Sequence, residues 1–366
     1  MYRTFSTFKH YRFIHLVAFS LLLILVACED EPEDFATFTF KENLGVPYNS
    51  EAEVEIEPLV DGLKLIELQI GDSIVSKWNN PGMKKVKYTL KSTDFGIGAK
   101  KIIVIAHNQN GEQFKDERTL RVLSDLQPEL WAYEVLSTFP HNIANFTQGF
   151  EFSGDQLYES TGQRGESKIA KIDIATGNDL SKIGLDATHF GEGITIFGDT
   201  VYQLTWTTNK CFLYDRNTLQ ILPKEYTYQG EGWGLCNDGK YLIMSDGTER
   251  LTFRDPKTFA VVKTIEVYTH EQPVTRLNEL EYIDGLIYAN IWMTNNIAAI
   301  EPETGRVIGV IDGSTLVPIG RGKVGDVFNG IAYNKTQDAI YVTGKNWEKT
   351  IKIKLKDKYE KVIASN

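Results

Sequence analysis

The chain has 366 residues, of which 42% are hydrophobic and 11% aromatic, and its formal net charge is −10. This length is enough for about two domains with substantial cores. An acidic chain without a basic cluster is a poor partner for nucleic acid, so we expect none. The 30 glycines, 17 tyrosines and 19 phenylalanines, spread over many short alternating runs, predict an all-β protein.

The first segment has the features of an export signal. Arg3, Lys9 and Arg12 precede an apolar run over residues 13–27, which is short for a membrane span of about 20 residues and fits a signal-peptide core. The run ends at Cys28 in a sequence that resembles a bacterial lipobox. We therefore expect a signal peptide over residues 1–27 and a lipid on the Cys28 thiol. An ordinary signal peptide or anchor with a chance cysteine is the alternative.

Residues 28–34 form an acidic segment that we interpret as a flexible tether. Together with the lipobox, it predicts a lipoprotein of the bacterial cell envelope, held in the outer membrane and facing the periplasm or the surface. Two further cysteines, Cys211 and Cys236, lie in strand-like runs, and we expect both to be buried free thiols.

Residues 35–124 predict a small domain without catalytic groups. Alternating or apolar runs occur at short intervals, over residues 52–56, 65–70, 86–90, 101–106 and 119–123. About seven short strands in such a stretch are typical of an immunoglobulin-like β-sandwich. Residues 125–132 would link this domain to residues 133–366.

From residue 133 the chain contains five copies of one sequence repeat: a polar residue begins a strand, and a second strand follows after a short turn. The opening residues are spaced by 44, 39, 47 and 51 positions, and they are Gln148, Glu192, Glu231, Asn278 and Asn329. A strand-rich unit of this period predicts one blade of a β-propeller. We therefore expect five blades, with residues 133–137 supplying the missing strand of the last blade and closing the ring.

The repeat also predicts a pocket. The five opening residues should crowd one mouth of the central channel, where the second strands end. Trp206, Trp292 and Lys345 are at those ends, and Trp233 follows Glu231 closely. A mouth with carboxylates, indoles and one ammonium is a candidate active site rather than a core.

Several of these motifs, taken in order, resemble the glutaminyl-peptide cyclotransferases of plants and bacteria. They include Phe146-Thr147-Gln148-Gly149, Phe190-Gly191-Glu192-Gly193, Leu277-Asn278-Glu279-Leu280, Asn329-Gly330-Ile331-Ala332 and Val342-Thr343-Gly344-Lys345. The resemblance runs from about Phe139 to Leu355 and leaves out the immunoglobulin-like domain. One departure is Glu231, where plant members of the family have Asp.

The resemblance implies a five-bladed propeller that converts an N-terminal glutamine to pyroglutamate and releases ammonia. Glu192 would be the proton shuttle, with Lys345 and Asn278 polarising the γ-carbonyl of the substrate. The remaining candidates would bind substrate, and they are Phe146, Gln148, Phe190, Trp206, Glu231, Trp233, Trp292 and Asn329. Glu231 in particular would suit the α-amine of the substrate.

Each of these roles has a structural alternative. Glu192 could hold blade ends together, the indoles could pack between blades, and Lys345 could pair with Glu231 or Asp246. We expect peptides or proteins with N-terminal Gln as substrates, a monomer, no cofactor and no catalytic metal, because no His or Cys spacing suggests one. Two other functions remain open: a non-catalytic propeller that binds peptide N-termini, and a propeller hydrolase or lactonase with a channel calcium.

Overall fold

The structure is a computed structural model that describes residues 34–356. The expected signal peptide, the Cys28 lipidation site and nearly all of the acidic tether therefore lie outside the described residues. The described chain is all-β, as the sequence predicts, with short helical turns at 92–94, 313–315 and 317–320. None of its helices is long and apolar enough to cross a membrane.

Two β-sheets form the N-terminal part of the described chain. One has the order β1-β3-β6 and the other β2-β8-β7-β4-β5. The bounds are β1 (Ala36–Phe38), β2 (Leu44–Pro47), β3 (Glu51–Pro58), β4 (Leu63–Ile70), β5 (Ser73–Asn79), β6 (Val86–Lys91), β7 (Gly98–Asn108) and β8 (Gln113–Leu123). In β3 the apolar side chains of Val54 and Ile56 are buried, while the carboxylates of Glu53 and Glu55 pair with lysines on the outside. This period of two places one apolar face of each sheet in a shared core.

Five sheets make up the rest. In sheets 1 to 4 four antiparallel strands pair in chain order, whereas in sheet 5 an earlier strand of the chain pairs with the last one. Sheet 1 contains β11 (Thr147–Ser153), β12 (Gln156–Thr161), β13 (Lys168–Asp173) and β14 (Asn178–Gly184); sheet 2 contains β15 (Gly191–Phe197), β16 (Thr200–Thr205), β17 (Lys210–Asp215) and β18 (Ile221–Thr227). Sheet 3 contains β19 (Leu235–Asn237), β20 (Leu242–Ser245), β21 (Arg250–Arg254) and β22 (Val261–Glu266). Sheet 4 contains β23 (Leu277–Ile283), β24 (Leu286–Ile291), β25 (Asn296–Ile300) and β26 (Val307–Asp312). Sheet 5 contains β27 (Phe328–Asn334), β28 (Ala339–Gly344), β29 (Lys349–Leu355) and β10 (Tyr133–Pro140).

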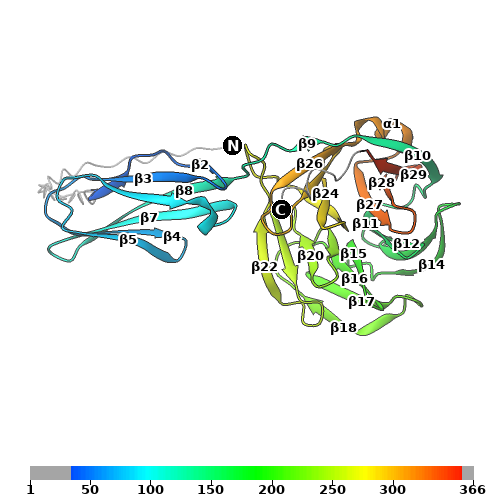
Figure 1. The fold of residues 1–366 in the computed structure, drawn as a ribbon. Helices are drawn as coiled ribbons and strands as arrows, with labels where there is room; N and C mark the ends of the chain where they lie inside the picture. Colours follow the sequence, from blue (N-terminus) through cyan, green and yellow to red (C-terminus); the bar gives the residue numbers. More distant parts are fainter. Residues whose placement is uncertain (1–33, 357–366) are drawn as a thin grey trace, which may run out of the picture.

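The first strands of these sheets contact one another in sequence order, from β11 through β15, β19 and β23 to β27, and β27 returns to β11. The sheets therefore surround a common centre (Figure 1). The expected closing strand is confirmed, because β10 pairs with β29 along its whole length. The expected linker holds one strand that the sequence did not predict: β9 (Glu129–Leu130) pairs in parallel with β26, next to Trp131, which packs on Gly309.

The strand register corrects the alignment of the third repeat. Leu235 faces Met244 across sheet 3 just as Ile194 faces Gln203 in sheet 2 and Leu280 faces Ala289 in sheet 4. Two residues before each of these positions stand Glu192, Trp233 and Asn278. The counterpart of Glu192 in sheet 3 is therefore Trp233 and not Glu231, which was matched through its flanking glycines.

Close packing around the centre explains why Gly234, and not Gly232, occupies the repeated position. A Cβ on Gly149 would come within 2.5 Å of the Ile194 nitrogen, and one on Gly193 within 2.5 Å of the Leu235 nitrogen. A Cβ on Gly234 would collide with the Asn278 carbonyl oxygen in the same way. The chain of sheets 1, 2 and 3 thus approaches the next sheet at a residue without a side chain.

The two parts of the chain are in direct contact. The Ala99 amide donates to Glu266 Oε2 at 2.9 Å, and the Arg306 guanidinium lies 3.2 Å from Asp125 Oδ1. Tyr268, which follows β22, belongs to the core cluster of the N-terminal sheets. Elsewhere in the described chain Cys211 and Cys236 are buried free thiols, as expected.

We predict that Gly193→Ala lowers the free energy of unfolding by about 1–3 kcal/mol, the usual cost of forcing an extra carbon into a packed core. Urea unfolding of the purified protein measures it. Gly184→Ala is the matched control, since the nearest atom to its added Cβ is 3.8 Å away. Equal stability of the two variants would contradict the close approach of the first strands.

Candidate active site

A cavity of about 260 Å³ opens where the first strands of the five sheets begin and the second strands end. It is lined by Phe146, Gln148, Phe190, Glu192, Trp206, Trp233, Asn278, Trp292, Met293, Asp326, Val327 and Lys345. Its volume is below the roughly 300–1,000 Å³ of pockets for drug-sized ligands. The cavity therefore suits a single amino-acid side chain better than a long segment.

All the predicted catalytic and substrate-binding residues line this cavity, apart from Glu231 and Asn329. Three lining residues were missed: Met293, Asp326 and Val327. Met293 has a positive φ of 66°, which directs the chain sharply after Trp292. No motif or spacing marks these three in the sequence, because they belong to loops whose path depends on the neighbouring sheets.

Glu192 is the buried carboxylate of the cavity, with 4% of its surface exposed. Gln148 Nε2 donates to Glu192 Oε1 at 3.0 Å. Asn329 Nδ2 in turn donates to Gln148 Oε1 at 3.3 Å. Asn329 is thus placed behind Gln148 and orients it. Burial raises the pKa of Glu192 well above its ordinary value; the nearby Lys345 ammonium opposes this and the Glu231 carboxylate adds to it.

Lys345 is the cation of the cavity and is also 4% exposed. Its Nζ lies 4.7 Å from the centre of the Phe146 ring, a cation–π contact. Burial lowers the pKa of Lys345, while Glu192 and Asp326 oppose that shift. Within residues 34–356 this ammonium makes neither of the ion pairs considered in the sequence analysis, with Glu231 or Asp246. It remains available to an oxygen of a ligand.

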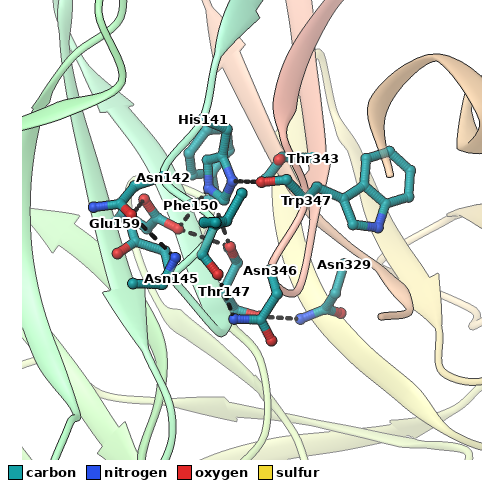
Figure 2. A network of polar contacts seen from close by, with 12 residues as sticks. His141, Asn142, Asn145, Thr147, Phe150, Glu159, Asn329, Thr343, Asn346 and Trp347 are labelled. Carbon is teal, nitrogen blue, oxygen red and sulfur yellow. Dashed lines mark hydrogen bonds and ion pairs between the residues drawn. The ribbon is translucent and has the colours of Figure 1, made fainter. Parts of the chain in front are cut away.

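The loop after Lys345 is held by a buried polar network beside the cavity (Figure 2). His141 Nδ1 lies 2.9 Å from the Trp347 carbonyl oxygen, and Nε2 lies 3.0 Å from Glu159 Oε1. Glu159 also accepts hydrogen bonds from Thr147 Oγ1 at 2.7 Å and Asn145 Nδ2 at 2.6 Å. Because β11 starts at Thr147, the same network fixes both the strand that carries Gln148 and the loop that carries Lys345.

The aromatic residues of the cavity meet edge to face. Ring centres are 6.1 Å apart for Phe146 and Phe190, 5.7 Å for Phe190 and Trp206, and 5.6 Å for Trp233 and Trp292. Such contacts hold rings at fixed angles and add roughly 0.5–1.5 kcal/mol each to the burial of their surface. The cavity therefore has a rigid apolar wall, and the Lys345 ammonium lies over one of its rings, that of Phe146.

Asn278 and Glu279 begin β23 with different surroundings. Asn278 lines the cavity, and its buried Oδ1 has no hydrogen-bond partner within the described residues. Glu279 points to the centre of the ring, where it accepts from the Phe150 amide at 3.1 Å and the Ile331 amide at 2.8 Å. Glu279 thus joins sheet 4 to sheets 1 and 5, and Asn278 is free to bind a ligand.

No group of three or more His, Cys, Asp or Glu side chains within residues 34–356 is arranged to hold a metal ion.

We predict that His141→Ala destabilises the protein by about 3–5 kcal/mol, because it leaves the buried Glu159 without its cation. Burial alone would lower the pKa of His141, but the Glu159 carboxylate outweighs it and the pKa is raised. The stabilisation is therefore complete below about pH 6.5 and is lost as the pH rises through the raised pKa.

Urea unfolding of wild type and variant at pH 6 and pH 9 tests this. The difference should be larger at pH 6. His189→Ala is the control, since the only hydrogen bond of the His189 imidazole within the described chain is to the Thr208 hydroxyl. A difference that does not depend on pH would contradict a charged His141.

Comparison with known proteins identifies relatives of this chain. Residues 103–355 match the family model of glutamine cyclotransferase, a match that begins within β7 and so earlier than the motifs suggest. A glutaminyl-peptide cyclotransferase of Arabidopsis thaliana is 41% identical over 240 residues, which are 63% of this chain and 74% of that protein. The crystal structure of a glutaminyl cyclase from Myxococcus xanthus gives a TM-score of 0.59 at 35% identity and covers 63% of this chain and 98% of the other. The chain belongs to the glutamine cyclotransferase family.

Proposed function

We propose that this protein is a glutaminyl-peptide cyclotransferase, which converts an N-terminal glutamine of a peptide or protein to pyroglutamate and releases ammonia. The observation that carries the proposal is one small cavity in which a buried carboxylate, a buried ammonium and an aromatic wall face the same space. Family membership and the 41% identity to a relative of that name support it.

The reaction requires no nucleophile from the protein. The α-amine nitrogen of the substrate forms a bond to the carbon of its own γ-carboxamide and gives a tetrahedral intermediate with an oxyanion. The bond between this carbon and the amide nitrogen then breaks, and that nitrogen leaves as ammonia after gaining a proton. The protein must hold the glutamine folded back on itself, move one proton and stabilise the oxyanion.

Glu192 takes the proton from the attacking amine and passes it to the leaving nitrogen. Its raised pKa suits both steps, because a carboxylate that binds a proton more readily than an ordinary Glu can take the proton from the amine and then donate it. The hydrogen bond from Gln148 to Oε1 orients the carboxylate. Lys345 and Asn278 both line the cavity and stabilise the oxyanion; within residues 34–356 the ammonium makes no direct ion pair.

The aromatic wall binds the side chain of the substrate glutamine. Phe146, Phe190, Trp206, Trp233 and Trp292 present apolar surface to its methylene groups and exclude water from the reacting atoms. Exclusion of water favours attack by the amine over hydrolysis of the amide.

We further propose that the five sheets form a five-bladed β-propeller and that residues 35–124 form an immunoglobulin-like sandwich, joined by residues 125–132. Of the predicted propeller range, 133–366, the last ten residues lie outside the described residues. The closed circuit of first strands and the pairing of β10 with β29 support the propeller. The two facing sheets that share one core support the sandwich. No residue before Phe146 lines the cavity within the described chain, so we propose a structural role for the sandwich.

The sequence of the first segment leads us to propose a lipid-anchored, monomeric lipoprotein of the bacterial outer membrane. The apolar run, the lipobox-like end at Cys28 and the acidic tether support this location. In such a protein the sandwich would act as a spacer between the membrane and the catalytic part.

We predict that Glu192→Gln lowers kcat by about 10²–10⁴-fold, the usual contribution of a positioned acid–base group. Ammonia release from Gln-containing dipeptides by the purified protein measures this, with and without a chelator. Glu225→Gln, on the exposed strand β18, is the matched control. Full activity of Glu192→Gln would contradict the shuttle, and loss of wild-type activity with chelator would contradict a metal-independent reaction. Peptide binding without turnover would favour a non-catalytic binding protein.

We predict that kcat of the wild type falls as the pH drops through the raised pKa of Glu192, because the protonated carboxyl cannot accept a proton. The loss should therefore begin well above pH 4.5, the ordinary value for Glu. The pH dependence of kcat measures it. If kcat fell only at or below pH 4.5, the ordinary pKa of Glu, this would contradict a raised pKa of Glu192.

We predict that Cys28→Ser moves the protein from the membrane fraction to the soluble fraction of a bacterial host, since the lipid would have no thiol to join. Fractionation and mass spectrometry of the N-terminal peptide measure it beside the wild type. Equal recovery of both forms in membranes, with no lipid on the wild type, would favour an ordinary anchor.

A further inference from the structure

One carboxylate oxygen accepts two indole hydrogen bonds behind the cavity. Trp206 Nε1 donates to Glu231 Oε2 at 2.7 Å, and Trp233 Nε1 donates to the same oxygen at 2.8 Å. Glu231 is half-buried and does not line the cavity. Hydrogen bonds from a neutral donor to a charged acceptor are stronger than those between neutral groups.

Glu231 closes a gap in the aromatic wall. On one side Phe146, Phe190 and Trp206 form a run of edge-to-face contacts, and on the other Trp233 meets Trp292. Within the described residues no ring contact joins Trp206 to Trp233. The shared oxygen of Glu231 is therefore the link between the two halves of the wall.

The backbone around Glu231 is fixed from both sides. The Gly232 amide donates to the Trp206 carbonyl at 3.1 Å, and the Trp233 amide donates to the Ser245 carbonyl at 3.0 Å. A side chain at Gly232 would collide with the Tyr228 hydroxyl, so only glycine allows this approach. The carboxylate is thus held where both indole N–H groups reach it.

These contacts argue against a role of Glu231 in binding the substrate amine. Its Oε2 is shared by two indoles that line the cavity, whereas Glu231 itself does not line it. We propose that Glu231 is a positioning residue: it sets the angle between Trp206 and Trp233 so that the two indoles form fixed walls around the substrate glutamine. This inference rests on the proposed function for its substrate and on the two hydrogen bonds for its geometry.

The charge of Glu231 has a second effect, on Glu192. The charged groups that act on Glu192 are Lys345, after β28, and Glu231, before β19; Tyr228 is also near and has a raised pKa, mainly through burial. The Glu231 charge raises the pKa of Glu192. Removing that charge should lower the pKa of Glu192, so that activity persists to lower pH.

Two substitutions separate geometry from charge. Glu231→Gln keeps a carbonyl oxygen at the same reach, which can still accept from both indoles, but it has no charge. Glu231→Leu has a similar size and neither charge nor acceptor. Glu225→Gln and Glu225→Leu, on exposed β18 where Glu225 pairs with Lys210, are the matched controls.

We expect KM for Gln-containing dipeptides to rise about tenfold or more in Glu231→Leu, because neither indole then has the acceptor that fixes its angle. Glu231→Gln should keep KM within about threefold of wild type, since most of the wall geometry remains. In both variants the acid limb of the pH dependence of kcat should move to lower pH. A substitution that only reduced the amount of folded protein would leave both that limb and KM unchanged.

A spectroscopic measurement tests the geometry without turnover. In the indole region of a ¹H–¹⁵N spectrum, two of the resonances from the six tryptophans should lie downfield in the wild type through their bonds to the carboxylate. They should move upfield in Glu231→Leu, and single Trp206→Phe and Trp233→Phe variants assign them. The Glu225 variants should leave both in place.

Three outcomes would overturn the inference. If Glu231→Gln raises KM as much as Glu231→Leu, the charge contacts the substrate amine and Glu231 is a binding residue. If the indole resonances are the same in wild type and Glu231→Leu, the shared hydrogen bonds do not exist. If KM and the acid limb stay at wild-type values in both variants, Glu231 has no positioning role. A wild type without turnover would instead refute the proposed function and leave the resonance test in force.

Discussion

The pairing of β10 with β29 is the constraint on which the rest of the structure depends. It joins the strand that precedes the first repeat to the strand that ends the last, so that the sheets surround one centre. Closure removes two sheet edges that would otherwise be unpaired. It also brings the starts of the five first strands together, and the cavity forms only where they meet.

The same closure explains the unusual electrostatics of the cavity. Glu192 comes from sheet 2 and Lys345 from the loop after β28 of sheet 5, and both are buried without a direct ion pair among the described residues. Burial disfavours the charged form of both groups. The opposite charge of the partner favours the charged form of each. Because these two effects oppose each other, either group can change its protonation state during a reaction. The groups of an exposed pair or of a tight salt bridge would resist such a change.

Polar side chains around the centre act as connections between sheets. Glu279 accepts backbone amides from sheets 1 and 5, and Asn329 of sheet 5 bonds to Gln148 of sheet 1. The His141 and Glu159 pair ties the loop of Lys345 to the start of β11. The reactive groups are therefore held by interactions between sheets, and the positioning role inferred for Glu231 follows the same pattern.

The sequence by itself determined the all-β class, the family, the strand that completes sheet 5 and most residues of the cavity. These depend on local signals: alternation of apolar residues, the period of the repeat, and side chains at repeated positions. It could not determine which residue of the third repeat corresponds to Glu192, because Gly230-Glu231-Gly232 has the same letters as Gly191-Glu192-Gly193. Only packing shows that Gly234 is the residue that lies against Asn278.

The tertiary structure also decided what the sequence left open for Glu231, Met293 and Asp326. Met293 and Asp326 reach the cavity through loops whose paths are set by neighbouring sheets. Glu231 lies behind two indoles rather than among the polar groups at the mouth. The physical reason is that a repeat pattern records which residues occupy equivalent places along a strand, whereas the contacts of a loop side chain depend on strands from other parts of the chain.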